Sequence, residues 1–387
     1  MQQSPDRYRR QTPAQVAAAH PAVAFYFYKL GAAGGGAERM VCQLAAAMVQ
    51  RGFQVHLITW DTSDASAFYP IGPDVSWTKL GFAPGAADKL RRVRVLYQTL
   101  RKHRIKVLVG FVMSGDRTVL AAAKLAGVRL VAAERNAPQM YGFRQGRWKR
   151  WLTFRLLGMA DRITIQMAGF AAGYPARLQA RLVTIPNPVP AAPLTAAPDV
   201  SDSMGGWTLL AVSRLDADQK RIDCLVSAFA QVAPQFPQWQ LRIVGDGTER
   251  DALLGQIAAL GLSARVRIEA STHAIFEVYA ASHLFVIPSR WEGFPNALAE
   301  AMACGLPAVG YERAAGVAEL IGKTGWLARG LDDPEALAEA LQHGMTDSAE
   351  RARRGRAAAE AMAQFVPSQQ FDRWRDLLQS LMVTESA

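Results

Sequence analysis

The chain alternates short apolar runs with amphipathic segments, and it does so in two separate sets. The apolar runs of the first set are residues 22–30, 53–59, 107–112, 129–133, 162–167 and 182–186, and those of the second set are 207–213, 241–245, 265–269, 284–289 and 307–311. Short apolar runs of this length fit strands that are buried on both faces, and helical patterns such as 117–126 lie between them. The order therefore predicts an α/β protein with two doubly wound, mostly parallel sheets.

Residues 191–206 separate the two sets and carry no periodic pattern. They are rich in Pro, Ala, Ser and Gly, which favour loops. Because 387 residues also exceed a typical single core, we expect two Rossmann-like domains. The predicted organisation is a flexible N-terminus at 1–21, a first domain at 22–190, a linker at 191–206, a second domain at 207–365, and a C-terminal crossover helix at 366–387 that returns to the first domain.

The cysteines and the terminal segments indicate a cytoplasmic protein. Cys42, Cys224 and Cys304 are widely spaced and form neither a CxxC pattern nor a set of metal ligands, which suits a reducing compartment. The first twenty residues are basic but lack the apolar segment of a signal peptide. Since no later stretch supplies about eighteen consecutive apolar residues, we predict neither secretion nor a membrane span.

Charge is distributed unevenly along the chain. Residues 1–200 hold 27 Lys and Arg against 10 Asp and Glu, whereas residues 201–387 hold 17 against 23. The basic half favours a polyanionic partner such as an anionic bilayer or a phosphorylated substrate, and a merely Arg-rich solvated surface is an equal alternative. No nucleic-acid reader motif is present and the second half is acidic, so no nucleic-acid partner is expected.

Two basic segments, 90–106 and 143–158, interleave Arg and Lys with aromatic and aliphatic residues, as interfacial helices do. We therefore predict peripheral docking on the anionic inner leaflet of a membrane. The residues proposed for this contact are Arg147, Trp148, Arg150 and Trp151. The alternative is that the apolar members of the second segment are partly core, namely Trp148, Trp151, Phe154 and Leu157.

Ligands of open parallel sheets bind beyond the carboxyl ends of the strands, so the loops that follow predicted strands are the candidate site. The first of these loops is the glycine-rich segment 31–39, which opens a helix. The backbone N–H groups of Gly35 and Gly36 can approach a phosphate there. The spacing matches neither GxGxxG nor GxxxxGK(S/T), and a flexible turn without a ligand is an equal alternative.

Two loops of the predicted second domain follow. Arg214 and Lys220 can neutralise a diphosphate, the first as a planar fork and the second as a point charge. Asp216 and Asp218 form a D-x-D pair, for which a polar loop with a helix N-cap is a better explanation than a metal site. The turn GDG at 245–247 is expected to serve close packing between strand and helix, with at most a minor role in lining the site.

The segment 288–305 carries two glutamates, Glu292 and Glu300. Pro295 suits a first helical turn and Gly305 suits a helix end, so Glu292 should precede the helix and Glu300 should lie inside it. The N–H groups of the first turn offer a site for a phosphate oxygen. By spacing alone two solvated glutamates are the simpler interpretation, but the surrounding residues favour a binding role.

These residues resemble the retaining glycosyltransferases of the GT-B fold, specifically glycosyltransferase family four, whose E-x7-E motif matches Glu292 and Glu300. Other matching segments occur in the family's order, including GGGAER, TIPNPV, SRLDADQKRID, LRIVGDGTERD and LFVIPSRWEGFPNALAEAMACGLPAV. GGGAER and AAERNAP, which contain Arg39 and Arg135, resemble the members that extend lipid-linked oligosaccharides or surface polysaccharides. Both arginines are therefore candidates for the acceptor side.

The resemblance implies a role for each candidate residue. Arg214 and Lys220 would hold the diphosphate of a nucleoside-diphosphate sugar, Glu300 the ribose hydroxyls and Glu292 the donor sugar. Gly35 and Gly36 would face the phosphate. The remaining contacts would come from the base-proximal Ser271 and Thr272 and from the segment Phe294, Pro295, Asn296, Ala297 and Leu298. Family members need no cofactor or divalent metal, and none is expected here.

One departure from the family concerns the loop after 107–112. Many relatives carry a histidine there that contacts the donor sugar, whereas residues 113–116 of this chain read Met-Ser-Gly-Asp. Ser114 or Asp116 would substitute. Asp116 is also a candidate to deprotonate or orient an acceptor hydroxyl.

The predicted activity is transfer of a sugar, with retention, from a UDP-linked donor to a lipid-linked glycan at the cytoplasmic membrane face. An N-acetylhexosamine is the expected sugar by the same resemblance. Two alternatives stay open, a glycosyltransferase that acts on a soluble acceptor and a sugar-nucleotide epimerase of similar architecture. An epimerase is not expected to carry the E-x7-E context or TIPNPV.

Overall fold

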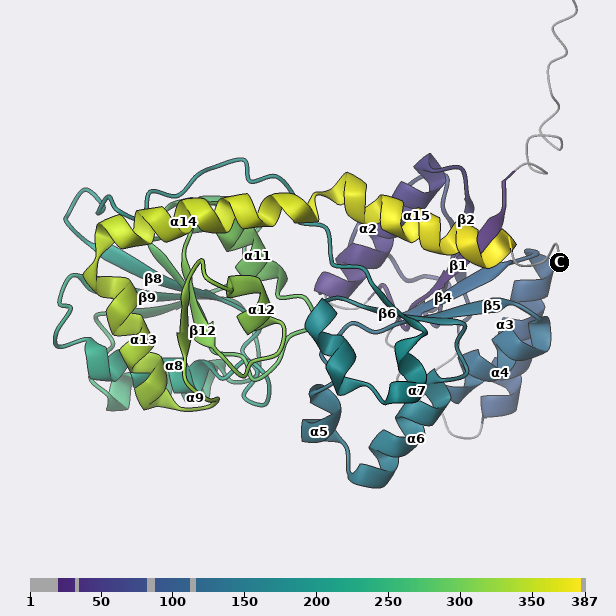
Figure 1. Cartoon of the computed structure of the whole chain (residues 1–387), viewed down its shortest axis with the longest axis horizontal. Helices are drawn as coiled ribbons and strands as arrows, with labels where there is room; N and C mark the ends of the chain where they lie inside the picture. Colours follow the sequence, from purple (N-terminus) through teal and green to yellow (C-terminus); the bar gives the residue numbers. More distant parts are fainter. Residues whose placement is uncertain (1–19, 32–34, 82–87, 112–115, 384–387) are drawn as a thin grey trace, which may run out of the picture. The chain divides into compact units, whose positions relative to one another are not determined.

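A computed structural model describes residues 20–31, 35–81, 88–111 and 116–383 of the chain (Figure 1). These residues form two compact units. The first comprises described residues within 1–134, 153–164 and 371–387, and the second comprises 135–152 and 165–370. Each unit contains a parallel sheet with helices, so the predicted α/β class is confirmed.

The first sheet has seven strands in the order β3-β2-β1-β4-β5-β6-β7. All five residues of the central strand β1 are buried, as expected for a strand covered on both faces. β1 pairs in parallel with both β2 and β4. The strands are β1 (Ala22–Tyr26), β2 (Gln54–Thr59), β3 (Ser76–Lys79), β4 (Val107–Phe111), β5 (Arg129–Ala133), β6 (Arg162–Ile165) and β7 (Leu182–Thr184).

Helix α4 begins and ends at residues suited to those positions. Asp116 caps α4 by accepting a hydrogen bond from the Thr118 backbone N–H, and Gly127 ends α4 in the left-handed conformation. Trp374 of the C-terminal helix stacks on Phe111 of β4. The helices between β1 and β7 along the chain are α2 (Gly36–Gln50), α3 (Lys89–Lys102), α4 (Arg117–Ala126), α5 (Met140–Arg144), α6 (Arg147–Leu157), η2 (Ala168–Gly173) and α7 (Ala176–Gln179), and the C-terminal helix is α15 (Pro367–Val383).

The second sheet has six strands in the order β10-β9-β8-β11-β12-β13. Its strands are β8 (Trp207–Val212), β9 (Trp239–Val244), β10 (Val266–Glu269), β11 (Leu284–Ile287), β12 (Ala308–Tyr311) and β13 (Trp326–Ala328). Its helices are α8 (Ile222–Val232), α9 (Arg250–Ala259), α10 (Ile275–Ala280), α11 (Asn296–Ala303), α12 (Val317–Ile321), α13 (Pro334–Thr346) and α14 (Ser348–Met362), followed by η3 (Ala363–Phe365).

Two edge strands, β3 and β13, were not predicted from the sequence. β3 is SWTK, none of whose residues is buried, and β13 has only three residues. Both lie at an end of their sheet, where one side of the strand has no neighbouring strand. Edge strands need no continuous apolar run, so the pattern that predicts buried central strands does not detect them.

Residues 191–206 form no helix or strand, in agreement with the predicted loop character, and they belong to the second unit. Arg351 of α14 is buried over the rings of Trp207 and Trp239, and its Nε donates to the Pro198 carbonyl at 2.9 Å. Burial lowers the pKa of Arg351 to about 10. The domain bounds at 190 and 207 stay predictions.

All three cysteines are free thiols in buried positions. Burial is the main cause that raises the pKa of Cys304 to about 12, and the nearby Glu300 adds to the effect. Within the described ranges, every helix is too short or too polar to cross a lipid bilayer.

Candidate active site

The strand order of the second sheet reverses between β8 and β11, which pair in parallel through Leu209 with Leu284 and Leu210 with Phe285. The loops after these two strands therefore leave the same edge of the sheet side by side. Such a switch point is the usual ligand position of a doubly wound sheet. The predicted residues Arg214 and Lys220 lie on the first of these loops, and Glu292 lies on the second.

Lys220 and Glu292 form an ion pair, with Nζ 2.6 Å from Oε1. The exposed fraction of their side chains is 15% and 8%, so water screens the pair only weakly. Gln219 joins the two loops as well, because its Nε2 donates to the Trp291 carbonyl at 2.9 Å and its own carbonyl accepts from the Arg290 N–H at 2.9 Å. The structure thus brings together two side chains that are 72 residues apart in sequence.

Glu300 lies inside α11 and Glu292 precedes it, as predicted. Both glutamates are only 6% exposed, so the interpretation as two solvated carboxylates is wrong. The Tyr279 hydroxyl, from α10, donates to Glu300 Oε2 at 3.2 Å. No sequence pattern had indicated Tyr279, which is a buried residue of the six-residue helix α10.

The start of α11 is where an anion site is predicted, and it has no side-chain cap. Pro295 occupies the N-cap position and provides no side-chain cap, so the N–H groups of Asn296, Ala297 and Leu298 lack acceptors of the helix itself. Phe294 and Leu298 are buried, and Gly305 follows the helix end with a φ of +86°. The helix dipole favours negative charge at the start of α11.

Arg214 is the exposed cation of the site, with 68% of its side chain accessible. Its Nη2 donates weakly to Gln219 Oε1 at 3.5 Å, and Nη1 lies 4.0 Å from Asp216. Both contacts are long, so a ligand can displace them at little cost.

Asp216 and Asp218 belong to a polar loop, as predicted. Asp216 Oδ1 accepts from the N–H groups of Asp218 and Gln219, at 2.9 and 3.2 Å. The predicted helix N-cap role is wrong, because α8 begins at Ile222 and its N-cap is Arg221. The part of the chain that the structure describes contains no group of three or more His, Cys, Asp or Glu side chains able to hold a metal ion.

The GDG turn at 245–247 packs closely, in agreement with its prediction. A Cβ on Gly245, whose φ is +152°, would lie 1.8 Å from the Ser213 carbonyl oxygen. Asp246 accepts from the Ser271 N–H at 2.9 Å, and this hydrogen bond lowers the pKa of Asp246. Ser271 and Thr272 are exposed.

Gly35, Gly36 and Asp116, all candidates in the first unit, lie at helix starts. Gly35 is the extended N-cap of α2 and Gly36 its first residue, while Arg39 is half-buried in the next turn. Asp116 accepts from Thr118 and from the Tyr26 hydroxyl at 2.9 Å, and it pairs with Arg92 at 3.4 Å. Burial and then the Asp116 charge raise the pKa of Tyr26. Ser114 lies outside the described residues.

Arg135 lies in a polar cluster beside the Glu292 loop. Asn187 Oδ1 accepts from Arg135 and from Gln166, and Asn187 Nδ2 donates to Asn296 Oδ1 at 2.8 Å. Burial lowers the pKa of Arg135 to about 10. A Cβ on Gly293 would lie 2.1 Å from the Arg135 carbonyl oxygen, so these segments require glycine there. The cluster fixes the start of α11, a role that the sequence did not indicate.

Helix α6 divides its apolar residues between core and surface. Trp148 and Trp151 are 73% and 44% exposed, and their rings stack at 4.7 Å. Phe154 and Leu157 are buried. The alternative of core residues in this segment is therefore right for Phe154 and Leu157 and wrong for Trp148 and Trp151. Arg147 and Arg150 are exposed beside the tryptophans.

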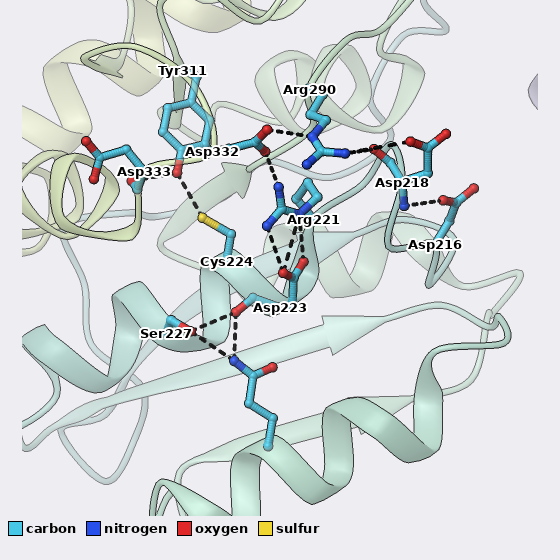
Figure 2. A network of polar contacts seen from close by, with 11 residues as sticks. Asp216, Asp218, Arg221, Asp223, Cys224, Ser227, Arg290, Tyr311, Asp332 and Asp333 are labelled. Carbon is cyan, nitrogen blue, oxygen red and sulfur yellow. Dashed lines mark hydrogen bonds and ion pairs between the residues drawn. The ribbon is translucent and has the colours of Figure 1, made fainter. Parts of the chain in front are cut away.

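Figure 2 shows a chain of arginines and aspartates that no sequence pattern had indicated. Its members are Asp218, Arg290, Asp332, Arg221 and Asp223, all within the second unit. The sequence does place charged residues in the loops after β8, β11 and β13, and this placement could have pointed to the chain.

The fold and the site define a two-domain protein of the GT-B class. Two family models match, "Glycosyltransferase Family 4" over residues 34–192 and "Glycosyl transferases group 1" over residues 206–347. The first match falls mainly within the predicted first domain, and the second mainly within the predicted second domain. The chain therefore belongs to the glycosyltransferases that combine these two domains.

Similar proteins include an exopolysaccharide phosphotransferase of Streptomyces coelicolor, 35% identical over 52% of this chain and 21% of the relative. An uncharacterized glycosyltransferase of Haemophilus influenzae is 24% identical over 77% of this chain and 83% of the relative. The GtfA subunit of a UDP-N-acetylglucosamine–peptide N-acetylglucosaminyltransferase of Streptococcus gordonii is 36% identical over 31% of this chain and 24% of the relative. The match thus spans under a quarter of the length of the first and third relatives.

Solved structures share the fold along nearly the whole chain. A sucrose-phosphate synthase of Thermosynechococcus elongatus superposes with a TM-score of 0.80 at 20% identity, covering 95% of this chain and 100% of the other. HepE of Anabaena in complex with UDP-glucose superposes with a TM-score of 0.75 at 20% identity, covering 93% and 100%.

Proposed function

We propose that this protein transfers a sugar, with retention of anomeric configuration, from a UDP-linked donor to a lipid-linked glycan at the cytoplasmic face of a membrane. The sugar is an N-acetylhexosamine. The observation that carries the proposal is the buried Lys220–Glu292 pair at the switch point of the second sheet, beside the uncapped start of α11.

The chemistry requires stabilisation of a departing diphosphate while the anomeric C–O bond breaks. The Lys220 ammonium, the exposed Arg214 guanidinium and the dipole of α11 supply positive charge on neighbouring loops of one sheet edge. Preorganised cations in a partly water-excluded site stabilise developing negative charge better than the same groups in water. No metal ion is needed in this account.

The two carboxylates divide the recognition of the donor. Glu300 is oriented by the Tyr279 hydroxyl and accepts hydrogen bonds from the ribose hydroxyls. Glu292, held by Lys220, faces the donor sugar. Neither acts as a covalent nucleophile here, and the acceptor attacks on the face from which the diphosphate leaves. The names of similar proteins support a UDP-linked donor and an N-acetylhexosamine.

The acceptor part of the proposal rests on α6. Exposed Trp148 and Trp151, stacked and flanked by Arg147 and Arg150, combine apolar area with positive charge, as membrane-surface helices do. The name of the Streptomyces coelicolor relative points to polysaccharide chemistry. That of the Streptococcus gordonii relative includes a peptide, so a soluble acceptor is the second candidate.

The donor is tested by thermal stabilisation with UDP-N-acetylglucosamine, UDP-glucose and GDP-mannose, followed by assays with lipid-linked acceptors. We expect the UDP-linked N-acetylhexosamine to stabilise the protein most and to yield a product of unchanged anomeric configuration by NMR. Arg214→Ala should lower turnover by about tenfold or more at unchanged melting temperature. Arg353→Ala is the control, because Arg353 is an exposed arginine of α14. An active Arg214→Ala variant would remove the diphosphate assignment, and interconversion of sugar nucleotides without acceptor would indicate an epimerase.

Membrane docking is tested by co-sedimentation with vesicles of phosphatidylglycerol and phosphatidylcholine at low and high salt. We expect binding to the anionic vesicles that salt abolishes and that Trp148→Ala/Trp151→Ala weakens. Phe68→Ala, which removes a 54% exposed aromatic side chain of the first unit, whereas Trp148 and Trp151 belong to the second, is the control. Absence of binding at low salt would favour a soluble acceptor.

A further inference from the structure

One carboxylate, that of Asp332, binds two arginines from two different loops (Figure 2). Its Oδ1 lies 2.5 Å from Arg221 Nη1, and its Oδ2 lies 2.5 Å from Arg290 Nε. The side chains of the three residues are 17% to 26% exposed. Because the three lie largely out of water, the attraction between them is screened less than that of a surface pair.

Each of these arginines is a close neighbour in sequence of a predicted site residue. Arg221 directly follows Lys220, and Arg290 lies two residues before Glu292. Arg290 also donates from Nη1 to the Asp218 carbonyl at 3.0 Å, and Arg221 forms hydrogen bonds with Asp223. Asp332 itself belongs to the loop that follows β13. A third loop thus ties together the two loops that carry the Lys220–Glu292 pair.

The backbone conformation at two of these residues indicates that they do more than close a loop. Arg221 and Asp332 have φ values of +49° and +57°, in the left-handed region that favours glycine. Such a backbone conformation is unfavourable for a residue with a side chain unless its surroundings compensate. Glycine would avoid this cost at position 332 but could not bind either arginine.

We propose that Asp332 is a positioning residue that fixes the spacing of Lys220 and Glu292 by clamping Arg221 and Arg290. The inference rests on the proposed transferase function for its catalytic consequence. Guanidinium groups fix direction as well as distance, since their donors form a rigid planar fork. A displacement of about 1 Å in a catalytic group lowers a rate by about a hundredfold, so a loosened clamp reduces turnover without removing any group that touches substrate.

The test compares two adjacent aspartates. Asp332→Gly removes the clamp and suits the left-handed backbone, so its melting temperature should stay close to that of the wild type. Asp333 is the N-cap of α13 and accepts from the Ala336 N–H at 3.1 Å. Asp333→Ala should therefore lower the melting temperature and leave the site intact. A residue with only a structural role would change stability and activity together.

Two readouts are used. Hydrogen–deuterium exchange by mass spectrometry should show faster exchange in Asp332→Gly for peptides that cover 214–221 and 288–294, with no change there in Asp333→Ala. Release of UDP from UDP-N-acetylglucosamine and UDP-glucose should show kcat lower by about tenfold or more in Asp332→Gly, with KM within about threefold of the wild type. Arg290→Gln removes the Arg290–Asp332 ion pair and leaves both left-handed residues unchanged. It should give the same faster exchange and lower kcat, and its effect should add little to that of Asp332→Gly in the double variant.

The outcomes separate this inference from the proposed function. Unchanged exchange in both loops of Asp332→Gly and Arg290→Gln overturns the clamp, whatever the nucleotide assays give. Faster exchange with unchanged kcat overturns the positioning role. If the wild type neither binds nor cleaves any sugar nucleotide while the exchange result holds, the proposed donor chemistry fails and the clamp stands.

Discussion

The Nζ of Lys220 lies 2.6 Å from Oε1 of Glu292, so one charge of each sign is held in a mostly buried position between two loops of the second sheet. The family resemblance assigns the diphosphate of the donor to Lys220 and the sugar to Glu292, so this contact links the two parts of the predicted donor site. In the proposed function, Glu292 orients the ammonium that faces the diphosphate, and Lys220 holds the carboxylate that faces the sugar. Stability and catalysis should therefore respond differently to changes in the pair.

Lys220→Met should lower the free energy of unfolding by about 2–4 kcal/mol, because it leaves the Glu292 carboxylate buried without its partner. Lys220→Met/Glu292→Leu should recover most of that loss, since no unpaired charge remains. UDP release should be abolished in the single variant and should not recover in the double variant. Chemical denaturation and a UDP-release assay measure the two effects. A double variant as unstable as the single one would contradict a compensated buried pair.

Tyr279→Phe should weaken UDP binding by about threefold to tenfold, because the variant loses the hydrogen bond that orients Glu300. The ring should keep its packing against Phe276 and Phe285, so the fold is preserved. Isothermal titration with UDP measures the change. Tyr97→Phe makes the same chemical change in α3 of the first unit and should leave the affinity as it is. Equal affinity of the wild type and Tyr279→Phe would argue that Glu300 needs no orienting partner.

Arg351→Leu should lower the free energy of unfolding by about 2–4 kcal/mol. Arg351 is 1% exposed, stacks over two indole rings, and donates to the carbonyls of Pro198, Gly344 and Met345. Removal of the guanidinium takes one hydrogen-bond donor away from each of these carbonyls. UDP release at temperatures below unfolding should be unaffected, because no Arg351 contact reaches the site loops. Arg353→Leu, an exposed position on the same helix, should leave the melting temperature unchanged.

The central strands of both sheets could be predicted because strands buried on both faces are continuous apolar runs, as the wholly buried β1 illustrates. The placement of Glu292 before α11 and of Glu300 inside it followed from Pro295 and Gly305. The contacts that the two glutamates make could not be predicted in this way. The Lys220–Glu292 and Asp332–Arg290 pairs depend on the order in which strands pair, which brings loops 72 and 42 residues apart to one sheet edge. Local patterns carry no information on that order.

The same limit applies to polar residues within apolar strands. His56 lies in β2 within the predicted run 53–59, which gave no indication that an imidazole would be 3% exposed there. Its ring centroid is 4.4 Å from that of His103. Burial, and then the nearby His103, lower the pKa of His56 to about 4 from an ordinary value of 6.5.

Stability should therefore fall in mild acid. The folded state keeps His56 neutral, whereas the unfolded chain binds a proton near the ordinary pKa of 6.5, so the unfolded state holds more protons between about pH 6.5 and pH 4. The stability contributed by the neutral ring is complete above pH 6.5 and is lost as the pH falls through that window. Between pH 6.5 and pH 5 we expect a loss of about 1–2 kcal/mol in the free energy of unfolding from this group.

Urea denaturation of the wild type and of His56→Phe at pH 7.5, 6.5, 5.5 and 5.0 tests this expectation. His56→Phe should show a shallower decline of stability towards acid than the wild type, because it has no proton to bind at this position. His273→Gln is the control, since His273 lies exposed in the loop before α10 and its removal should leave the pH dependence of the wild type in place. Parallel pH profiles for the wild type and His56→Phe would show that protonation of His56 does not set the acid sensitivity of the first unit.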